Sequence, residues 1–355
     1  MLKALRGIAW FLQEKIGWNR IGFLLSATII TVAIVVLYRQ LHNIEIKEVY
    51  DALRGVKFYH VASAALSVAA GYLTLTCYDW FALRAIGRKE LPYRVAALAG
   101  FTSYSVGHNV GATVFTGGAV RYRIYSAYGL DAIEVAKICF IAGLTFWLGN
   151  AAVLGLGVVY EPEAASAIDQ LPAWLNRVFG AGILLVLASY VAWVWSAPRL
   201  LGRGGWEVRL PNGPTTLLQI CIGILDLACC AFAMYMLMPA DPAIDFVSLA
   251  VIFVTATLLG FASHSPGGLG VFDATMLVAL WQFDKEDLLA GLLLFRLLYY
   301  LVPFALSLTL LGIREAMIAT RTPGVVTPPG PHVVATTAPI KTEIEKQAQE
   351  IGKGP

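Results

Sequence analysis

The chain has 355 residues, of which 58% are hydrophobic and only 14% charged, and its mean hydropathy is +0.70. A soluble domain carries about 25% charged residues, because much of its surface faces water, so this composition excludes a soluble enzyme, a secreted disulfide scaffold and a disordered regulator. The net charge of +3 is too small to indicate a nucleic-acid partner. Lipid must therefore be the solvent for most of the chain.

In chain order, a basic amphipathic start at residues 1–20 is followed by a series of apolar runs. A membrane span needs about 20 apolar residues. The runs cover 21–38, 61–83, 95–116, 138–159, 178–196, 217–238, 246–281 and 288–311. No small-residue cleavage site follows the first run, so we interpret it as a span and not as a signal peptide.

Two of these runs are interrupted by residues that do not suit a continuous helix. The run 95–116 contains SVGHNVG, and the run 246–281 is too long for one span and contains SHSPGGLG. Irregular backbone at membrane depth is tolerated only where protein or a water-filled cavity satisfies it. Both runs are therefore predicted to be re-entrant helical hairpins. Each has a histidine followed by Gly-Gly, which either reflects an inverted repeat or arises by chance.

The distribution of basic residues predicts which side of the membrane each loop occupies. The N-terminus and the segments 84–94 and 197–209 are basic, whereas the loops 160–177 and 239–245 are acidic. We expect an all-α polytopic protein of a bacterial inner membrane, with about six full transmembrane helices, two hairpins entering from opposite sides, and both termini in the cytoplasm. The loop 39–57 opposes this orientation, because it is basic and would lie outside.

The last part of the chain differs in composition from the apolar runs. From Thr322 it is dominated by Pro, Thr and Gly. We expect 21–315 to form the transmembrane domain and 316–355 a disordered cytoplasmic tail, with a short helix near 340–350. The five cysteines lie in apolar runs and are expected to pack between helices.

Charged side chains at membrane depth cost about 2.5–3.5 kcal/mol on insertion scales and are therefore candidates for function. Asp79 lies near the end of one apolar run, and Asp226 and Arg296 each lie in the middle of another. Arg296 is predicted to share a helix face with Tyr299 and Tyr300. One interpretation is a polar cavity in which Arg296 binds a phosphate and an aspartate binds an amine. The other is a buried Asp–Arg pair that only holds helices together.

The glycines of the two interrupted runs are candidate phosphate-binding elements, because a helix N-terminus offers unpaired N–H groups and glycine lets a phosphate approach them. These glycines are Gly117, Gly118, Gly267, Gly268 and Gly270. Each group is expected to precede a short helix, the second one at about 271–281. The alternative is that these glycines only permit tight turns and close helix contacts.

Two arginines follow the first interrupted run. Arg121 and Arg123 would point about 200° apart on a helix, so both cannot bind one head group. Arg121 is expected to share a face with Tyr125 and Tyr128. One arginine is predicted to face the cavity and the other to reach lipid head groups at the cytoplasmic surface, unless both only anchor the interface.

Two histidines, His108 and His264, lie at the breaks, and neither has a second His, Cys or Glu at metal-ligand spacing. We therefore predict no metal, and expect His108 and Asn109 to satisfy the broken backbone by hydrogen bonds. No nucleophile elbow, zinc-hydrolase or nucleotide-binding motif is present, so no catalytic residue, cofactor or energy source is predicted.

The residues around the two breaks resemble a known family. They are Gly107-His108-Asn109, Gly117 through Tyr125 with Gly129-Leu130, and Pro266 through Asp273. They are similar to the transmembrane region of the lysylphosphatidylglycerol synthetase/flippase family, the multiple peptide resistance factor, over about residues 20–315. The resemblance implies that Asp79 and Arg296 correspond by location to intramembrane charges of that family.

In two-domain members of that family this region is the flippase module, and a separate cytoplasmic domain makes the aminoacylated lipid. We expect a standalone member without that domain, hence not an enzyme, which translocates a phospholipid such as aminoacylated phosphatidylglycerol. Its expected partners are membrane phospholipids, a separately encoded aminoacyl-lipid synthase and a second copy in a homo-oligomer. Two alternatives remain: a membrane-embedded enzyme acting on lipids or lipid-linked sugars, and a non-catalytic accessory of a lipid synthase.

Overall fold

The computed structural model describes residues 54–203, 206–263 and 265–320, together with scattered positions between 28 and 47. The chain divides into two units, one up to Ile313 and one from Arg314. The expected N-terminal segment, most of the run 21–38 and the tail beyond residue 320 lie outside the described residues.

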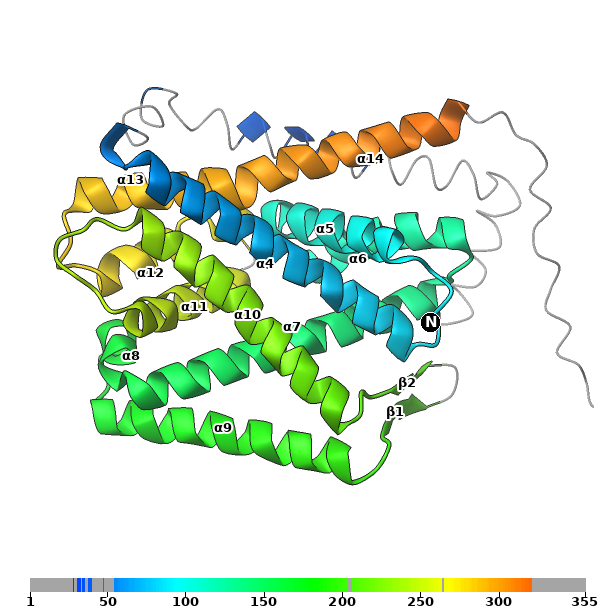
Figure 1. Ribbon diagram of the computed structural model, residues 1–355, viewed down its shortest axis with the longest axis horizontal. Helices are drawn as coiled ribbons and strands as arrows, with labels where there is room; N and C mark the ends of the chain where they lie inside the picture. Colours follow the sequence, from blue (N-terminus) through cyan, green and yellow to red (C-terminus); the bar gives the residue numbers. More distant parts are fainter. Residues whose placement is uncertain are drawn as a thin grey trace, which may run out of the picture. The chain divides into compact units, whose positions relative to one another are not determined.

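The described elements are nearly all helices, as expected from the apolar runs (Figure 1). In chain order they are α4 (Phe58–Ala85), α5 (Tyr93–Val110), α6 (Thr113–Tyr125), η1 (Ser126–Tyr128), α7 (Ala132–Tyr160), α8 (Pro162–Asp169), α9 (Ala173–Ser196), β1 (Leu200–Arg203), β2 (Trp206–Arg209), α10 (Gly213–Leu237), α11 (Phe246–Ala262), η2 (Pro266–Gly268), α12 (Val271–Ala279), α13 (Lys285–Phe295), η3 (Arg296–Leu301) and α14 (Val302–Thr320). The strands β1 and β2 form a short antiparallel pair.

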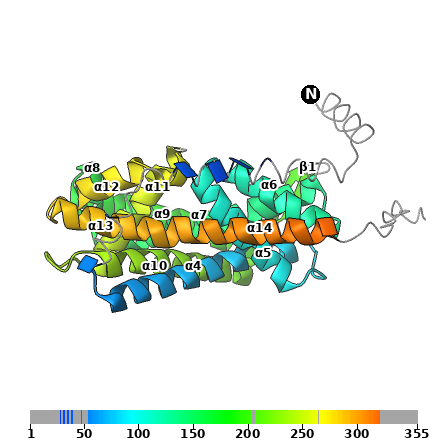
Figure 2. The ribbon, with the colours of Figure 1, turned by 90° about the horizontal axis from the view of Figure 1, so that it is seen from above.

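Five helical segments of the described chain are long and apolar enough to cross a membrane. They are Phe58–Ala85, Ala132–Tyr160, Ala173–Ser196, Gly213–Leu237 and Lys285–Ile318. The last comprises α13, η3 and α14, which follow one another as a continuous helix (Figure 2). The predicted all-α polytopic class is confirmed. Residues 316–320, which we expected in the tail, still belong to α14.

Polar N-caps fix where several helices begin. The Asp131 carboxylate accepts a hydrogen bond from the backbone N–H of Glu134, and the backbone N–H of Asp131 donates to the Glu134 carboxylate, so that a capping box starts α7. The side chains of Asn212, Asp245 and Asp284 cap α10, α11 and α13 by accepting backbone N–H groups of the first turn, without a return bond. Such caps satisfy N–H groups that the helix itself leaves unpaired. They explain why α7 begins six residues or so before its apolar run, which starts near residue 138.

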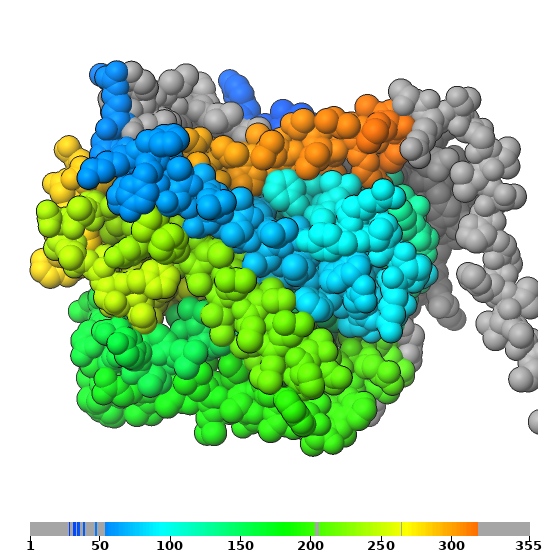
Figure 3. Space-filling model, viewed as in Figure 1, coloured from blue at the N-terminus to red at the C-terminus, as the bar shows by residue number. Residues whose placement is uncertain are grey.

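Close helix crossings hold the long helices of this unit together. Helix α10 packs against α4 on one side and α7 on the other, and α7 packs against α9. In Figure 3, α4 (blue) and α10 (yellow-green) lie against each other on the visible face. Where α7 crosses α10, Gly149 faces Gly223: a Cβ on Gly149 would lie 2.6 Å from the Cα of Gly223. Only two glycines permit this approach.

We therefore expect Gly149→Ala to lower the free energy of unfolding by about 1–3 kcal/mol, because the backbones of α7 and α10 must separate. Gly143 on the same helix provides a matched control, since a Cβ there would meet no described atom within 4 Å. Gly143→Ala is expected to stay within about 0.5 kcal/mol of the unchanged protein. Thermal unfolding in detergent micelles measures both, and equal effects would contradict the crossing.

The first interrupted run forms a helix hairpin, α5 and α6, which pack along each other. The chain reverses at Gly111 and Ala112, whose φ angles are 84° and 47°. The hairpin also returns to its starting side, because Arg88, which precedes α5, forms an ion pair of 2.7 Å with Glu134 in the first turn of α7. The flanks of α5 and α6 are thus joined.

The second interrupted run forms the hairpin α11 and α12, which contact each other across the break at 263–270. The break uses positive φ angles of 61°, 62° and 83° at Gly267, Gly268 and Gly270, which suit glycine. This hairpin returns as well, since the carbonyl of Leu237 at the end of α10 lies against Gly291 of α13.

The two hairpins approach each other from opposite ends of the long helices. In Figure 1, α5 and α6 lie toward the end marked by β1 and β2, and α11 and α12 toward the end marked by α8. Their inner parts meet, because α5 contacts η2 and the His108 ring lies 5.4 Å from the Phe261 ring. The site is built around this meeting point.

One expectation about the first hairpin is wrong. Gly117 and Gly118 do not precede the second helix but lie inside α6, which already begins at Thr113. Gly117 serves a packing role, since a Cβ there would lie 3.1 Å from the Ser103 carbonyl oxygen of α5. In contrast, Gly267, Gly268 and Gly270 do precede the short helix α12, as predicted.

Candidate functional site

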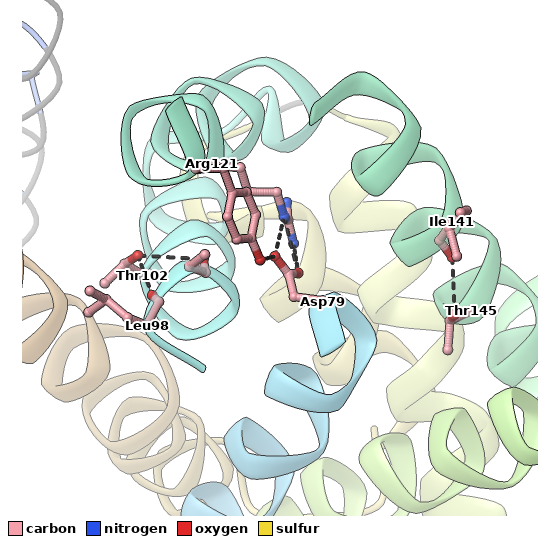
Figure 4. A network of polar contacts seen from close by, with 8 residues as sticks. Asp79, Leu98, Thr102, Arg121, Ile141 and Thr145 are labelled. Carbon is pink, nitrogen blue, oxygen red and sulfur yellow. Dashed lines mark hydrogen bonds and ion pairs between the residues drawn. The ribbon is translucent and has the colours of Figure 1, made fainter. Parts of the chain in front are cut away.

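A buried ion pair joins α4 to α6. The guanidinium of Arg121 donates from Nη2 to Asp79 Oδ1 at 2.7 Å and from Nε to both carboxylate oxygens at 3.1 and 3.0 Å. Tyr125 adds a hydrogen bond to Oδ2 at 2.8 Å, and Arg121 lies 4.8 Å from the Tyr104 ring centre. Figure 4 shows Arg121 pointing directly at Asp79. Both oxygens of the Asp79 carboxylate are therefore hydrogen-bonded, and Arg121 is its counter-ion.

A second buried carboxylate, Asp226 in the middle of α10, has fewer and longer hydrogen bonds. Tyr78 donates to Oδ2 at 3.1 Å, and Thr74 donates to Oδ1 at 3.2 Å. The Thr74 hydroxyl has a single proton and makes a shorter bond of 2.6 Å to the Gly71 carbonyl. Among the described residues, no Lys or Arg forms an ion pair with Asp226. Asp226 is only 3% exposed, so its charge is neither solvated nor paired.

Asp226 lines a narrow cavity enclosed by α4, α5, α7, α10, α11 and η3. Its polar lining residues are His108, Asp226, Cys230, Thr257, Tyr299 and Tyr300. His108 is 8% exposed, and its buried Nδ1 atom has no hydrogen-bond partner within the described part of the chain. The cavity thus brings an unpartnered ring nitrogen and an unpaired carboxylate into one lining, and such unsatisfied buried groups call for an explanation.

Next to the cavity, η3 is a π-helical turn from Arg296 to Leu301, a feature that recurs at functional sites. Its widened backbone is held by side chains from two other helices. Tyr72 donates to the Tyr299 carbonyl at 3.0 Å, and Asn109 donates to the Tyr300 carbonyl at 3.2 Å. Asn109 thus bridges the first hairpin to η3.

Arg296 lies apart from this cavity. It forms an ion pair with Asp273 of α12, in which Nε donates to Oδ1 at 3.0 Å and Nη2 bonds to Oδ2. Asp273 also accepts from the Gly270 N–H at 3.2 Å. The two side chains are 14% and 23% exposed, so the pair is reachable from outside. Arg296 therefore fastens the second hairpin to η3, and its predicted grouping with Asp79 or Asp226 is wrong.

The structure thus divides the candidate residues into three places. His108 and Asp226 line the cavity, with Asn109 beside it; Asp79 and Arg121 pair between α4 and α6, close to Gly117; and Arg296 pairs near Gly270. The remaining candidates do not join these groups: Gly118 faces Cys139, Arg123 is half-buried, Gly267 is buried, and Gly268 lies against Gly260 and Phe272. His264 lies outside the described residues.

Four residues that were not among the predicted site residues complete these places. Tyr78 and Thr74 bind Asp226, Tyr125 binds Asp79, and Asp273 binds Arg296. Asp273 carried a usable signal, since it lies three residues after the last break glycine, where an acidic residue caps a helix. No sequence pattern pointed to Tyr78 or Thr74. In the part of the chain that the structure describes, no cluster of His, Cys, Asp or Glu is suited to a metal.

Fold and site together define a multi-pass membrane protein with a polar cavity between two broken helix hairpins. The chain is 27% identical over 310 residues to the uncharacterized protein slr0712 of Synechocystis, covering 87% of this chain and 95% of that protein. It is 26% identical to the inner membrane protein YbhN of Escherichia coli, with coverages of 82% and 91%. No family model matches it.

A third relative is phosphatidylglycerol lysyltransferase of Staphylococcus haemolyticus, at 22% identity over 81% of this chain but only 33% of that enzyme. The Staphylococcus aureus enzyme gives 25% identity, with 82% and 34% covered. The predicted resemblance is therefore confirmed: over most of its length, the chain is related to the membrane region of the phosphatidylglycerol lysyltransferases and to YbhN.

Proposed function

We propose that this protein binds a membrane phospholipid and moves its head group between the two leaflets, past the point where the hairpins meet. The observation that carries the proposal is Asp226, an unpaired buried carboxylate that shares a cavity with the unpartnered His108 nitrogen. Charge at membrane depth is costly, so it persists where it serves a pathway. Broken helices in both halves of a chain are the usual elements of such a pathway.

The relatives indicate the kind of molecule that is moved. Phosphatidylglycerol lysyltransferase is named for a phospholipid, and the part of it that matches this chain is its membrane region. Phosphatidylglycerol and its aminoacylated form are therefore the first substrates to test, and a separately encoded synthase is the partner that would supply the latter. The chain itself acts as a translocator and not as an enzyme.

The three polar places have different roles in this proposal. The cavity around Asp226 and His108 is the central passage. The Arg296–Asp273 pair, which is partly exposed, is the outer contact for a phosphate, because a guanidinium binds phosphate in the same forked geometry as a carboxylate. The Asp79–Arg121 pair, whose two side chains are buried, holds the first hairpin in place. Both chain termini lie in the cytoplasm.

Reconstitution in liposomes tests the proposal. The protein is incorporated into vesicles that contain fluorescent phosphatidylglycerol, lysyl-phosphatidylglycerol or phosphatidylethanolamine, and dithionite reports which leaflet holds the dye. We expect at least one head group to cross faster than in protein-free vesicles and in vesicles with heat-denatured protein. Rates equal to those controls for all three lipids would contradict translocation.

A further inference from the structure

The two buried aspartates differ in a way that lipid binding alone does not explain. Asp79 receives three guanidinium contacts and a tyrosine hydroxyl, all at 3.1 Å or less. Asp226 receives one tyrosine hydroxyl and part of one threonine hydroxyl, each at 3.1 Å or more. A carboxylate has about four lone-pair sites for hydrogen bonds. The charge of Asp226 is therefore left without compensation, unlike that of Asp79.

The surroundings of Asp226 contain many titratable groups, but none of the described Lys or Arg side chains forms an ion pair with it; Arg121 of α6, 4.8 Å from the Tyr104 ring centre, pairs with Asp79 and acts on His108 electrostatically. The titratable groups that face Asp226 are Tyr72 and Tyr78 of α4, Tyr104 and His108 of α5, Cys229 and Cys230 of α10, and Tyr299 and Tyr300 of η3. The lining residues from α7 and α11, such as Phe146 and Thr257, do not titrate. Of this set, His108 has a buried ring nitrogen, Nδ1, that has no hydrogen-bond partner among the described residues.

From this arrangement we infer that Asp226 and His108 form a proton-binding site, and that translocation is coupled to the passage of that proton. The inference rests on the proposed function. Water from one side delivers a proton to a carboxylate oxygen of Asp226, which becomes a neutral acid and can remain at this depth. The proton then leaves to water on the opposite side, either directly or through His108 Nδ1, which releases it again, so that the carboxylate and the neutral imidazole are both restored.

The geometry explains why one carboxylate binds the proton and the other does not. Protonation of Asp226 breaks no ion pair, and the new O–H finds acceptors in the cavity. Protonation of Asp79 would leave Arg121 buried without its counter-ion. A proton gradient would also supply the energy for transport. The sequence contains no nucleotide-binding motif, and outward movement of a cationic lipid needs energy because it opposes an inside-negative potential.

Infrared difference spectroscopy of the protein in nanodiscs tests the site without any transport. A pH titration is expected to reveal the carbonyl band of a buried carboxylic acid, which is lost in Asp226→Asn. Glu163→Gln, which removes an exposed carboxyl of α8, is the matched control and should keep the band. Absence of the band in the unchanged protein, or its persistence in Asp226→Asn, overturns the inference.

Proteoliposomes with a trapped pH dye and the membrane potential clamped at zero test the coupling. For one proton per zwitterionic lipid, the leaflet ratio of fluorescent phosphatidylethanolamine should shift about tenfold per unit of pH difference. A lipid that crosses but ignores the pH difference overturns the coupling and leaves the proposed function intact. If no lipid crosses in symmetric buffer, the proposed function is wrong. The infrared band then still shows whether Asp226 binds a proton.

Discussion

Asp226→Asn is expected to slow phospholipid translocation by at least about tenfold, the change that follows from roughly 1.4 kcal/mol of lost barrier stabilisation. Asparagine keeps the size of the side chain and an oxygen that accepts from Tyr78, and its NH2 group can donate to the Thr74 hydroxyl oxygen, so the main losses are the charge and the proton site. Because the carboxylate is unpaired, its loss leaves no opposite charge uncompensated. The variant should therefore fold as well as the unchanged protein.

Thr257→Val provides the matched control for this variant. Thr257 lines the same cavity, but its hydroxyl donates to the carbonyl of Phe253 within its own helix, so the replacement changes little in the cavity. The dithionite assay compares the three proteins at equal amounts of folded protein. If Asp226→Asn translocates as fast as Thr257→Val, Asp226 is not part of the passage.

Arg121→Met is expected to lower the free energy of unfolding by about 3–5 kcal/mol, because it leaves the buried carboxylate of Asp79 without a counter-ion. The double variant Asp79→Leu/Arg121→Met should recover most of this loss, since two apolar side chains replace two charges. Unfolding in detergent micelles, followed by tryptophan fluorescence, gives the values for both variants. A loss below about 1 kcal/mol in the single variant would show that the pair is not buried in membrane-like surroundings.

The same double variant separates the two interpretations that the sequence left open. If Asp79 and Arg121 only hold α4 and α6 together, the stable double variant should translocate lipid at close to the unchanged rate. If it is stable but inactive, the pair takes part in transport. Both carboxylate oxygens of Asp79 are already hydrogen-bonded to Arg121 and Tyr125, which favours the first result.

Much of the fold follows from the sequence, because lipid imposes one strong rule: a span must be about 20 residues of apolar helix. That rule predicted the five described spans and both interrupted runs. It could not give the helix ends, since these depend on caps such as Asp131 that lie outside the apolar pattern. The break in the first hairpin is at Gly111 and Ala112, at the end of the predicted interruption SVGHNVG, whereas Gly117 and Gly118, which we expected to precede the second helix, lie inside α6.

The site could be predicted only in part. Helix periodicity correctly put Arg121 and Tyr125 on one face, and both bind Asp79. Which charge pairs with which depends on helices distant in sequence, and a local pattern carries no such information. The partner of Arg296 was therefore missed, and the π-helical turn that begins at Arg296 changed the spacing that the prediction assumed.

The central claim is that two helix hairpins enter the membrane from opposite sides and meet around Asp226. Single cysteines at four exposed positions, in a variant without the five native cysteines, test it most directly. The positions are Lys89 and Ala127, which flank the first hairpin, and Asp241 and Gln282, which flank the second.

A membrane-impermeant maleimide is applied to intact and to permeabilised spheroplasts. We predict that Lys89→Cys and Ala127→Cys are both labelled only after permeabilisation, and that Asp241→Cys and Gln282→Cys are both labelled in intact spheroplasts. If the members of either pair are labelled from different sides, that hairpin crosses the membrane, and the passage proposed between the hairpins does not exist.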